Sequence, residues 1–187
     1  TSFRHALFQT VSIASTTGFA SSDFNLWPDF SRYVLLLLMF VGGCSGSTAG
    51  GMKVSRFVIL LKVTWAELRR TIHPRLVYSI KMGGRNVPPV VVGNVTRFFY
   101  LYMIVFSTLT LLISLTGLSM LDSMGIIAAC MSSVGPAFGI VGPTATYADV
   151  STFGRLVVIA AMILGRLEIF TLLIIMRPDF WRVKRNW

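Results

Sequence analysis

The stretch Ser15-Thr16-Thr17-Gly18-Phe19 lies between a short apolar segment, residues 3–14, and a polar loop with two aspartates. The apolar segment is too short to cross a bilayer, which takes about 20 helical residues. We therefore predict a half-helix that enters a membrane and returns as extended backbone, which is tolerated there only beside protein or water. Small hydroxyl side chains and a glycine let consecutive carbonyls face a dehydrated cation, as in an ion filter. Thr-Thr-Gly is also typical of an ordinary turn, so the interpretation depends on the rest of the chain.

The composition indicates a membrane protein. Hydrophobic residues make up 54% of the 187 residues and charged residues only 13%, with a mean hydropathy of +0.72, which excludes an ordinary soluble domain and favours a polytopic membrane protein. The net charge is +10, but most bases lie between apolar runs, where they report membrane orientation, so we expect no nucleic-acid partner. Cys44 and Cys130 indicate neither a disulfide framework nor a zinc site. Neither a signal peptide nor an initiator methionine opens the sequence, so we expect a part of a longer polypeptide.

A second apolar run, residues 33–41, breaks into a glycine-rich segment before helical character resumes at Val54. The segment consists of Gly42, Gly43, Cys44, Ser45, Gly46, Ser47, Thr48, Ala49, Gly50 and Gly51. Its five glycines disfavour a helix, at about 1 kcal/mol each relative to alanine. We predict one membrane crossing interrupted by a flexible segment. A soluble linker, or a helix-packing face with small-xxx-small spacing, is the alternative.

The basic residues predict the orientation. The stretch 53–85 contains eight lysines and arginines and a single acid, Glu67, which places it on the cytoplasmic side. Proline and glycine breakers between Pro74 and Pro89 mark a linker between two membrane units. Residues 98–121 contain no charged residue before Asp122 and form the clearest transmembrane helix, and residues 156–176 form another. Four bases after this run predict a cytoplasmic C-terminus.

The chain contains an internal repeat. Residues 122–132 form another short apolar segment, followed by Ser133-Val134-Gly135-Pro136 and a polar return through Asp149. Residues 31–34 align with 154–157, and Gly42 aligns with Gly165. We predict an all-α polytopic membrane protein built of helix, re-entrant pore loop and helix, as in potassium channels. The predicted units are residues 1–72, a first repeat without its leading helix, residues 73–94, a cytoplasmic basic linker, and residues 95–187, a second repeat.

Charge placement agrees with these repeats. Four aspartates lie around the two pore loops on the predicted outer side, where they would raise the local cation concentration: Asp23, Asp29, Asp122 and Asp149.

These residues resemble the superfamily of potassium transporters that includes TrkH, KtrB and the plant HKT proteins, and most closely the C-terminal half of a bacterial TrkH-type protein. The likeness rests on residues 15–19, 42–53, 133–136 and 165–168 and covers essentially the whole chain. It implies four repeats around one pore, of which this chain holds the third and fourth, so that it cannot enclose a pore alone. It implies a transporter of potassium and not an enzyme, with potassium as substrate and no cofactor. The implied filter comprises Thr16, Thr17, Gly18, Phe19, Ser133, Val134, Gly135 and Pro136, with carbonyls of Thr16, Thr17, Ser133 and Val134 coordinating the ion.

The same resemblance identifies residues 42–51 as an intramembrane gate loop under the filter. Arg166, an ionisable residue in an apolar span, is expected to contact this loop and to form a barrier to cations. A structural ion pair with Glu168 is the alternative. The resemblance further implies a homodimer in the bacterial inner membrane, in contact with lipids and with a cytoplasmic nucleotide-binding regulatory subunit of the TrkA type.

Two other function classes compete with a transporter. Gly43-Cys44-Ser45-Gly46 matches the Gly-x-Ser-Gly pattern of rhomboid intramembrane serine proteases. A serine nucleophile needs a base within hydrogen-bond reach, and the only histidines, His5 and His73, lie outside the apolar crossings, which disfavours a protease. A nonconducting membrane scaffold stays open from the sequence.

Overall fold

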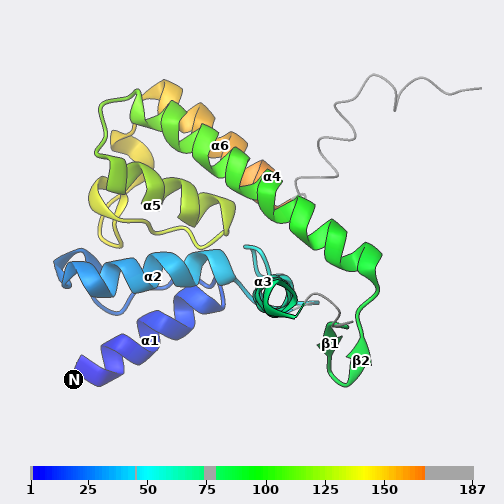
Figure 1. Cartoon of the computed structure of the whole chain (residues 1–187). Helices are drawn as coiled ribbons and strands as arrows, with labels where there is room; N and C mark the ends of the chain where they lie inside the picture. The colour runs from blue at the N-terminus through cyan, green and yellow to red at the C-terminus, as the bar shows by residue number, and fades with distance from the viewer. Residues whose placement is uncertain (1, 45, 74–78, 167–187) are drawn as a thin grey trace, which may run out of the picture.

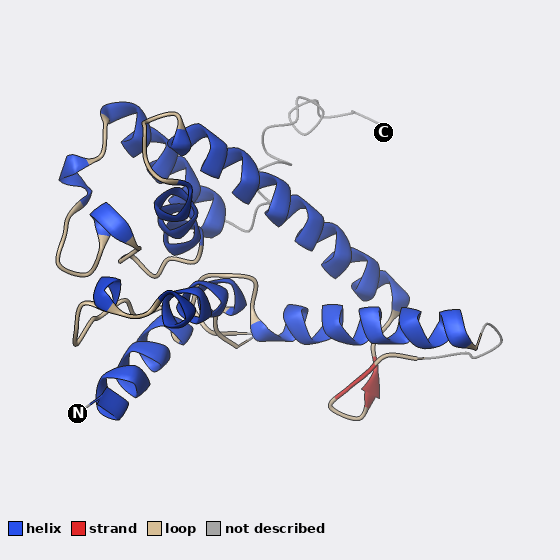
Figure 2. Cartoon of the chain, turned by 60° about the vertical axis from the view of Figure 1, so that its left-hand side comes forward, coloured by secondary structure: helices blue, strands red, loops and turns tan. Residues whose placement is uncertain are grey.

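The computed structural model describes residues 2–44, 46–73 and 79–166, and it is predominantly helical (Figures 1 and 2). This confirms the predicted all-α class. The elements, in chain order, are α1 (Ser2–Ala14), η1 (Phe24–Leu26), α2 (Asp29–Val41), α3 (Val54–Ile72), β1 (Lys81–Met82), β2 (Arg85–Asn86), α4 (Pro89–Ser114), α5 (Met120–Met131), η2 (Gly139–Val141), η3 (Tyr147–Asp149) and α6 (Thr152–Arg166).

The short helix α5 lies at the centre of the fold. It packs against α4, α6 and α2, and α1 packs against α2 (Figure 1). Every residue from Gly125 to Met131 is buried, as expected for a helix that is apolar on all sides. The predicted half-helices of both repeats are therefore present as α1 and α5. Each is too short to span a bilayer.

The long helix α4 differs from its predicted bounds, 98–121. It begins at Pro89, because proline is tolerated in the first helical turn and the helix then runs through the polar residues that precede Phe98. It ends at Ser114, since Gly117 turns with a φ of 85° and Ser119 caps α5, accepting a hydrogen bond from the Asp122 amide at 3.2 Å. Helix α4 thus starts inside the segment assigned to the linker, residues 73–94.

Among the described residues, α4 is the one helix long and apolar enough to cross a membrane. The other predicted crossing, residues 156–176, is described only as far as Arg166, as part of α6. Its remainder lies outside the described residues.

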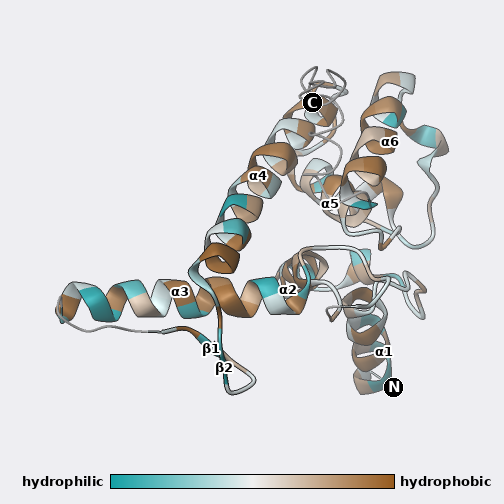
Figure 3. Cartoon of the chain, turned by 90° about the vertical axis from the view of Figure 1, so that its right-hand side faces the viewer, coloured by the Kyte–Doolittle hydropathy of each residue, from teal (hydrophilic) through white to brown (hydrophobic). Residues whose placement is uncertain are grey.

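Helices α2 and α3 do not lie on one line. Figure 1 shows α2 lengthwise and α3 end-on, and Figure 3 shows the reverse. Helix α3 begins at Val54, where the sequence predicts that helical character resumes. Hydrogen bonds close the loop between them: the Met52 amide donates to Phe40 O at 3.2 Å, and the Val54 amide donates to Gly43 O at 3.0 Å. The interruption is therefore a folded loop that redirects the chain.

The linker contains a small β-hairpin that the sequence reading misses. Strands β1 and β2 are antiparallel and are joined by Gly83 and Gly84, with φ of 56° and 78°, the conformation that tight hairpin turns require. Lys62 Nζ donates to Lys81 O at 2.6 Å and ties the hairpin to α3.

Candidate functional site

The first candidate filter stretch, residues 16–19, leaves the end of α1 through a fixed turn. Thr16 has a φ of 55° and Gly18 a φ of 78°, which is a backbone conformation that favours glycine. Behind the turn, the amides of residues 15, 16 and 17 donate to carbonyls of residues 11, 13 and 12, at 2.9, 3.0 and 2.9 Å. Ser12 Oγ donates to Phe19 O at 2.7 Å.

The second stretch, residues 133–136, has the same backbone 117 positions later. Ser133 has a φ of 56° and Gly135 a φ of 102°. The amides of residues 132, 133 and 134 donate to carbonyls of residues 128, 130 and 129, at 3.0, 3.2 and 2.9 Å, which matches the first stretch bond for bond. The internal repeat inferred from the sequence therefore extends to individual backbone hydrogen bonds.

The helices that follow the two return loops, α2 and α6, also correspond to each other, but they lie further apart in the sequence than the filter stretches do. Helices α2 and α6 begin at Asp29 and Thr152, which are 123 positions apart. The second return loop is therefore six residues longer than the first. The repeats then diverge, because α2 ends before Gly42, whereas α6 continues through the aligned Gly165.

The two filter stretches lie against each other. A Cβ atom placed on Gly18 would collide with the carbonyl oxygen of Val134 and touch Pro136. A cavity of about 340 Å³ lies beside them, lined by both filter glycines, by Phe19, Pro136 and Tyr147, and by parts of the second return loop. The structure thus brings together the candidate filter residues of both repeats at the ends of two half-helices, α1 and α5.

The predicted gate loop, residues 42–51, contacts both candidate filter stretches. The Gly50 amide donates to Thr16 Oγ1 at 3.3 Å. A Cβ atom on Gly50 would collide with the carbonyl oxygen of Ser132, directly before the second stretch. Gly42 in turn lies against Gly50 O. Ser45 lies outside the described residues.

Arg166 reaches the gate loop from α6. Its Nη1 donates to Thr48 O at 2.6 Å. Both residues line a cavity of about 230 Å³ between the loop, α4 and α6, together with Lys53, Arg56 and Tyr102. Three basic side chains therefore surround the space next to the gate loop, where a positive charge would oppose a cation. Glu168, the alternative partner of Arg166, lies outside the described residues.

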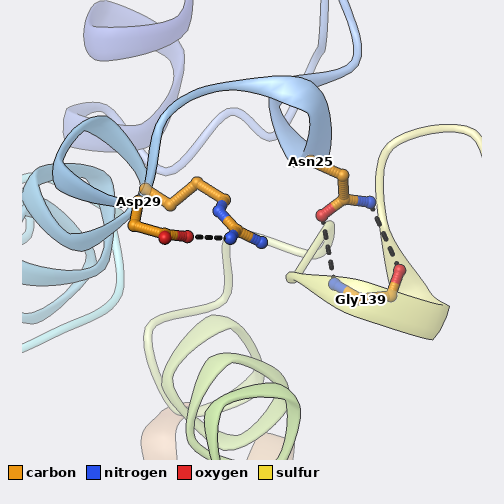
Figure 4. A network of polar contacts seen from close by, with 4 residues as sticks. Asn25, Asp29 and Gly139 are labelled. Atoms are coloured by element: carbon orange, nitrogen blue, oxygen red, sulfur yellow. Dashed lines mark hydrogen bonds and ion pairs between the residues drawn. The ribbon is translucent and has the colours of Figure 1, made fainter.

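The two return loops are joined by a contact that the sequence analysis misses. Asn25, in the first return loop, binds the backbone of Gly139 in the second: its Nδ2 donates to Gly139 O at 3.2 Å, and the Gly139 amide donates to its Oδ1 at 3.0 Å (Figure 4). Nearby, Asp29 forms an ion pair with Arg32. Asp23 caps η1, accepting from the Asn25 amide at 2.9 Å.

Tyr147 is a second residue that the sequence reading misses. Its hydroxyl donates to Gly135 O at 2.6 Å and lies 3.4 Å from Cys130 Sγ. Burial raises the pKa of Tyr147 above its ordinary value, and the neighbouring Cys130 adds to the increase. The hydroxyl therefore stays protonated as a donor at neutral pH. Cys130 and Cys44 are both free thiols.

The protease alternative finds no catalytic pair in the described residues. His5 Nδ1 lies 3.1 Å from Ser21 Oγ, so this histidine is engaged at the start of α1 and not at the gate loop. His73 is exposed at the end of α3.

Comparisons with known proteins give one consistent result. A family model for TrkH, described as cation transport protein, matches residues 1–182. The Trk system potassium uptake protein TrkH of Vibrio parahaemolyticus is 46% identical over 180 residues, which are 96% of this chain and 37% of the relative. TrkH of Escherichia coli K12 is 41% identical over 177 residues, and TrkG of the same organism is 36% identical over 181 residues.

A solved structure agrees with these relatives. The crystal structure of the potassium transporter TrkH from Vibrio parahaemolyticus matches with a TM-score of 0.87 and 46% identity, covering 96% of this chain and 38% of that one. The chain spans about 37% of the length of the curated relatives named above.

Proposed function

Because the chain belongs to the TrkH family of cation transport proteins, we propose that it forms part of a membrane transporter for potassium uptake and supplies two repeats of its pore. Curated relatives with 36–46% identity are named Trk system potassium uptake proteins. The observation that carries the proposal is the pair of filter stretches with matching hydrogen bonds, whose glycine and valine, Gly18 and Val134, lie in contact. The family is one of transporters, which removes the protease reading.

The filter would act through its backbone. Carbonyl oxygens of Thr16, Thr17, Ser133 and Val134 would replace the hydration shell of potassium, and Phe19 and Pro136 would complete the two stretches. Helices α1 and α5 both end directly before these stretches. Their carboxyl ends bring partial negative charge to the ion, which favours a cation over an anion. Two further repeats would complete the ring of carbonyls.

The loop 42–51 would act as the gate. Its contacts with Thr16 and Ser132 support a position under the filter. The Arg166 hydrogen bond to Thr48 O would hold the loop in a closed arrangement, and the Arg166 charge would oppose cations in the adjacent cavity. Release of this contact would open the path.

The surroundings of the transporter follow from the same proposal. We place it as a multi-pass protein in the bacterial inner membrane with a cytoplasmic C-terminus, in contact with lipid, because basic residues gather on one side of the predicted crossings. It would form a homodimer and bind a TrkA-like, nucleotide-binding cytoplasmic subunit. The exposed basic end of α3, with Arg69 and Arg70, supports a partner or anionic lipid on that side.

The test compares potassium, rubidium and sodium flux in liposomes that contain the intact four-repeat transporter. Gly135→Ser is the informative variant, because no atom lies within 4 Å of a Cβ there and only the φ of 102° resists the side chain. Gly18→Ser adds a collision with the second stretch, and Gly93→Ser, in open space on α4, is the matched control. We expect selective potassium and rubidium flux that both filter variants relax and the control preserves.

The outcomes separate the function classes. A folded protein that passes no ion, with its regulatory subunit present, would support a nonconducting scaffold. Ser45→Ala distinguishes a gate from a protease, since a gate retains or increases transport and a serine protease loses its activity.

A further inference from the structure

The carbonyl of Gly135 is held by a side chain from the second return loop. Tyr147 lies 12 residues after Gly135, and its hydroxyl donates to Gly135 O at 2.6 Å. Gly135 has a φ of 102°, which favours glycine, and its carbonyl belongs to the peptide that leads into Pro136, whose ring narrows the conformations of Gly135 without giving the carbonyl a partner. The tyrosine hydrogen bond supplies that partner and holds the carbonyl in one direction.

The loop that carries Tyr147 is itself anchored to α6. Arg155 Nη2 donates to Ala148 O at 2.7 Å, and Arg155 Nε donates to Val150 O at 2.9 Å. Val150 is 2% exposed and belongs to the hydrophobic core. The backbone directly after Tyr147 is thus tied to the first turn of α6, and the Tyr147 side chain reaches from this anchored loop to Gly135.

The two repeats hold their filter stretches by different hydroxyls. In the first repeat, Ser12 Oγ donates to Phe19 O from the half-helix, whereas the residue 117 positions later is Ala129, which has no hydroxyl. In the second repeat the donor is Tyr147, whereas the corresponding positions of the first repeat, 117 and 123 residues earlier, hold Phe30 and Phe24. Within the described part of the chain, each repeat therefore has one hydroxyl that donates to a carbonyl of its candidate filter stretch, and neither donor has a counterpart at the aligned position of the other repeat.

We propose that Tyr147 is a positioning residue of the filter, which fixes the orientation of the Gly135 carbonyl and so contributes to the preference for potassium over sodium. The inference rests on the proposed function as a potassium transporter. Gly135 directly follows Ser133 and Val134, whose carbonyls are proposed to coordinate the ion, so holding the Gly135 carbonyl also limits how these two can move. A filter that coordinates by backbone discriminates ions through the number and placement of its carbonyls. Loss of the hydroxyl would let the Gly135 peptide adopt further orientations, and the preference would weaken while ions still pass.

The test measures the ratio of potassium to sodium flux in liposomes with the intact transporter, for wild type, Tyr147→Phe and Tyr100→Phe. Tyr147→Phe removes one oxygen and keeps the ring, and Tyr100, 64% exposed on α4, is the matched control. We expect the ratio to fall about 5-fold in Tyr147→Phe, as for the loss of one hydrogen bond between neutral groups, and to stay unchanged in Tyr100→Phe. Thermal unfolding of the same samples reports whether the variants fold.

A folded Tyr147→Phe with the wild-type flux ratio would overturn the inference while leaving the proposed function intact. A wild-type transporter without selective potassium flux would instead overturn the proposed function. If Tyr147→Phe does not fold, Arg155→Gln decides, because it loosens the loop and leaves Tyr147 and Gly135 in place. A lowered flux ratio in that variant supports the inference, and an unchanged ratio refutes it.

Discussion

Replacing Arg166 with alanine is expected to raise potassium flux about tenfold. Arg166 Nη1 donates to Thr48 O at 2.6 Å, and a hydrogen bond with a charged donor contributes about 1.5–3 kcal/mol. The Arg166 side chain is exposed, so solvent screening favours the lower end of this range. A loss of about 1.4 kcal/mol changes an equilibrium tenfold, so the open fraction of a mostly closed gate rises by about that factor. Removal of the positive charge acts in the same direction, because it lowers the barrier to cations.

The assay is rubidium uptake into liposomes containing the intact transporter, normalised to the amount of folded protein. Arg166→Lys keeps the charge and one donor and should retain most of the closed state. Arg97→Ala removes an exposed base from α4 and should leave the flux unchanged. A folded Arg166→Ala with wild-type flux would refute the reasoning. If Arg97→Ala raised rubidium uptake by the same factor, the effect would come from the change in overall charge and not from the contact between Arg166 and Thr48.

Three further outcomes concern stability. Asn25→Ala removes both hydrogen bonds to the Gly139 backbone and should lower the free energy of unfolding by about 1–3 kcal/mol, measured in denaturant. An unchanged value would show that this contact does not stabilise the packing of the two return loops. The raised pKa of Tyr147 means that the folded state binds this proton more tightly, so its stabilising contribution is complete below about pH 10 and falls as the pH rises further. Above about pH 10, the free energy of unfolding should therefore fall more steeply with pH in the wild type than in Tyr147→Phe. Gly165→Ala places a Cβ against the backbone at the end of α5 and should lower the free energy of unfolding by about 1–3 kcal/mol. Gly93→Ala, in a helix and in open space, should raise it by about 0.5–1 kcal/mol in the same denaturant measurement.

Local features of the fold were readable from the sequence. The half-helices, the glycine-rich interruption and the start of α3 at Val54 follow from hydropathy and from the low helix propensity of glycine. The predicted bounds of α4 were wrong because an apolar run marks only the hydrophobic part of a helix. The helix itself continues through polar residues such as Asn94 until its terminal backbone groups are capped. The hairpin was missed because its strands are two residues long and have no periodicity to detect.

The correspondence between the two repeats could be predicted from the sequence only in part. The sequence aligned Gly18 with Gly135, and the structure extends the match to equivalent hydrogen bonds behind each filter turn. Residues that hold the filter in different ways in the two repeats, such as Ser12 and Tyr147, leave no such signal, because a comparison of repeats detects what they share.

The sequence by itself determined the elements and their membrane character, because helix, turn and half-helix depend on interactions between residues a few positions apart. Only the tertiary structure decided which residues meet around the candidate filter stretches. Gly50 reaches Thr16 across 34 positions, Asn25 reaches Gly139 across 114, and Arg166 reaches Thr48 across 118. Such contacts depend on how the helices pack around α5, and neither hydropathy nor local propensity records that packing.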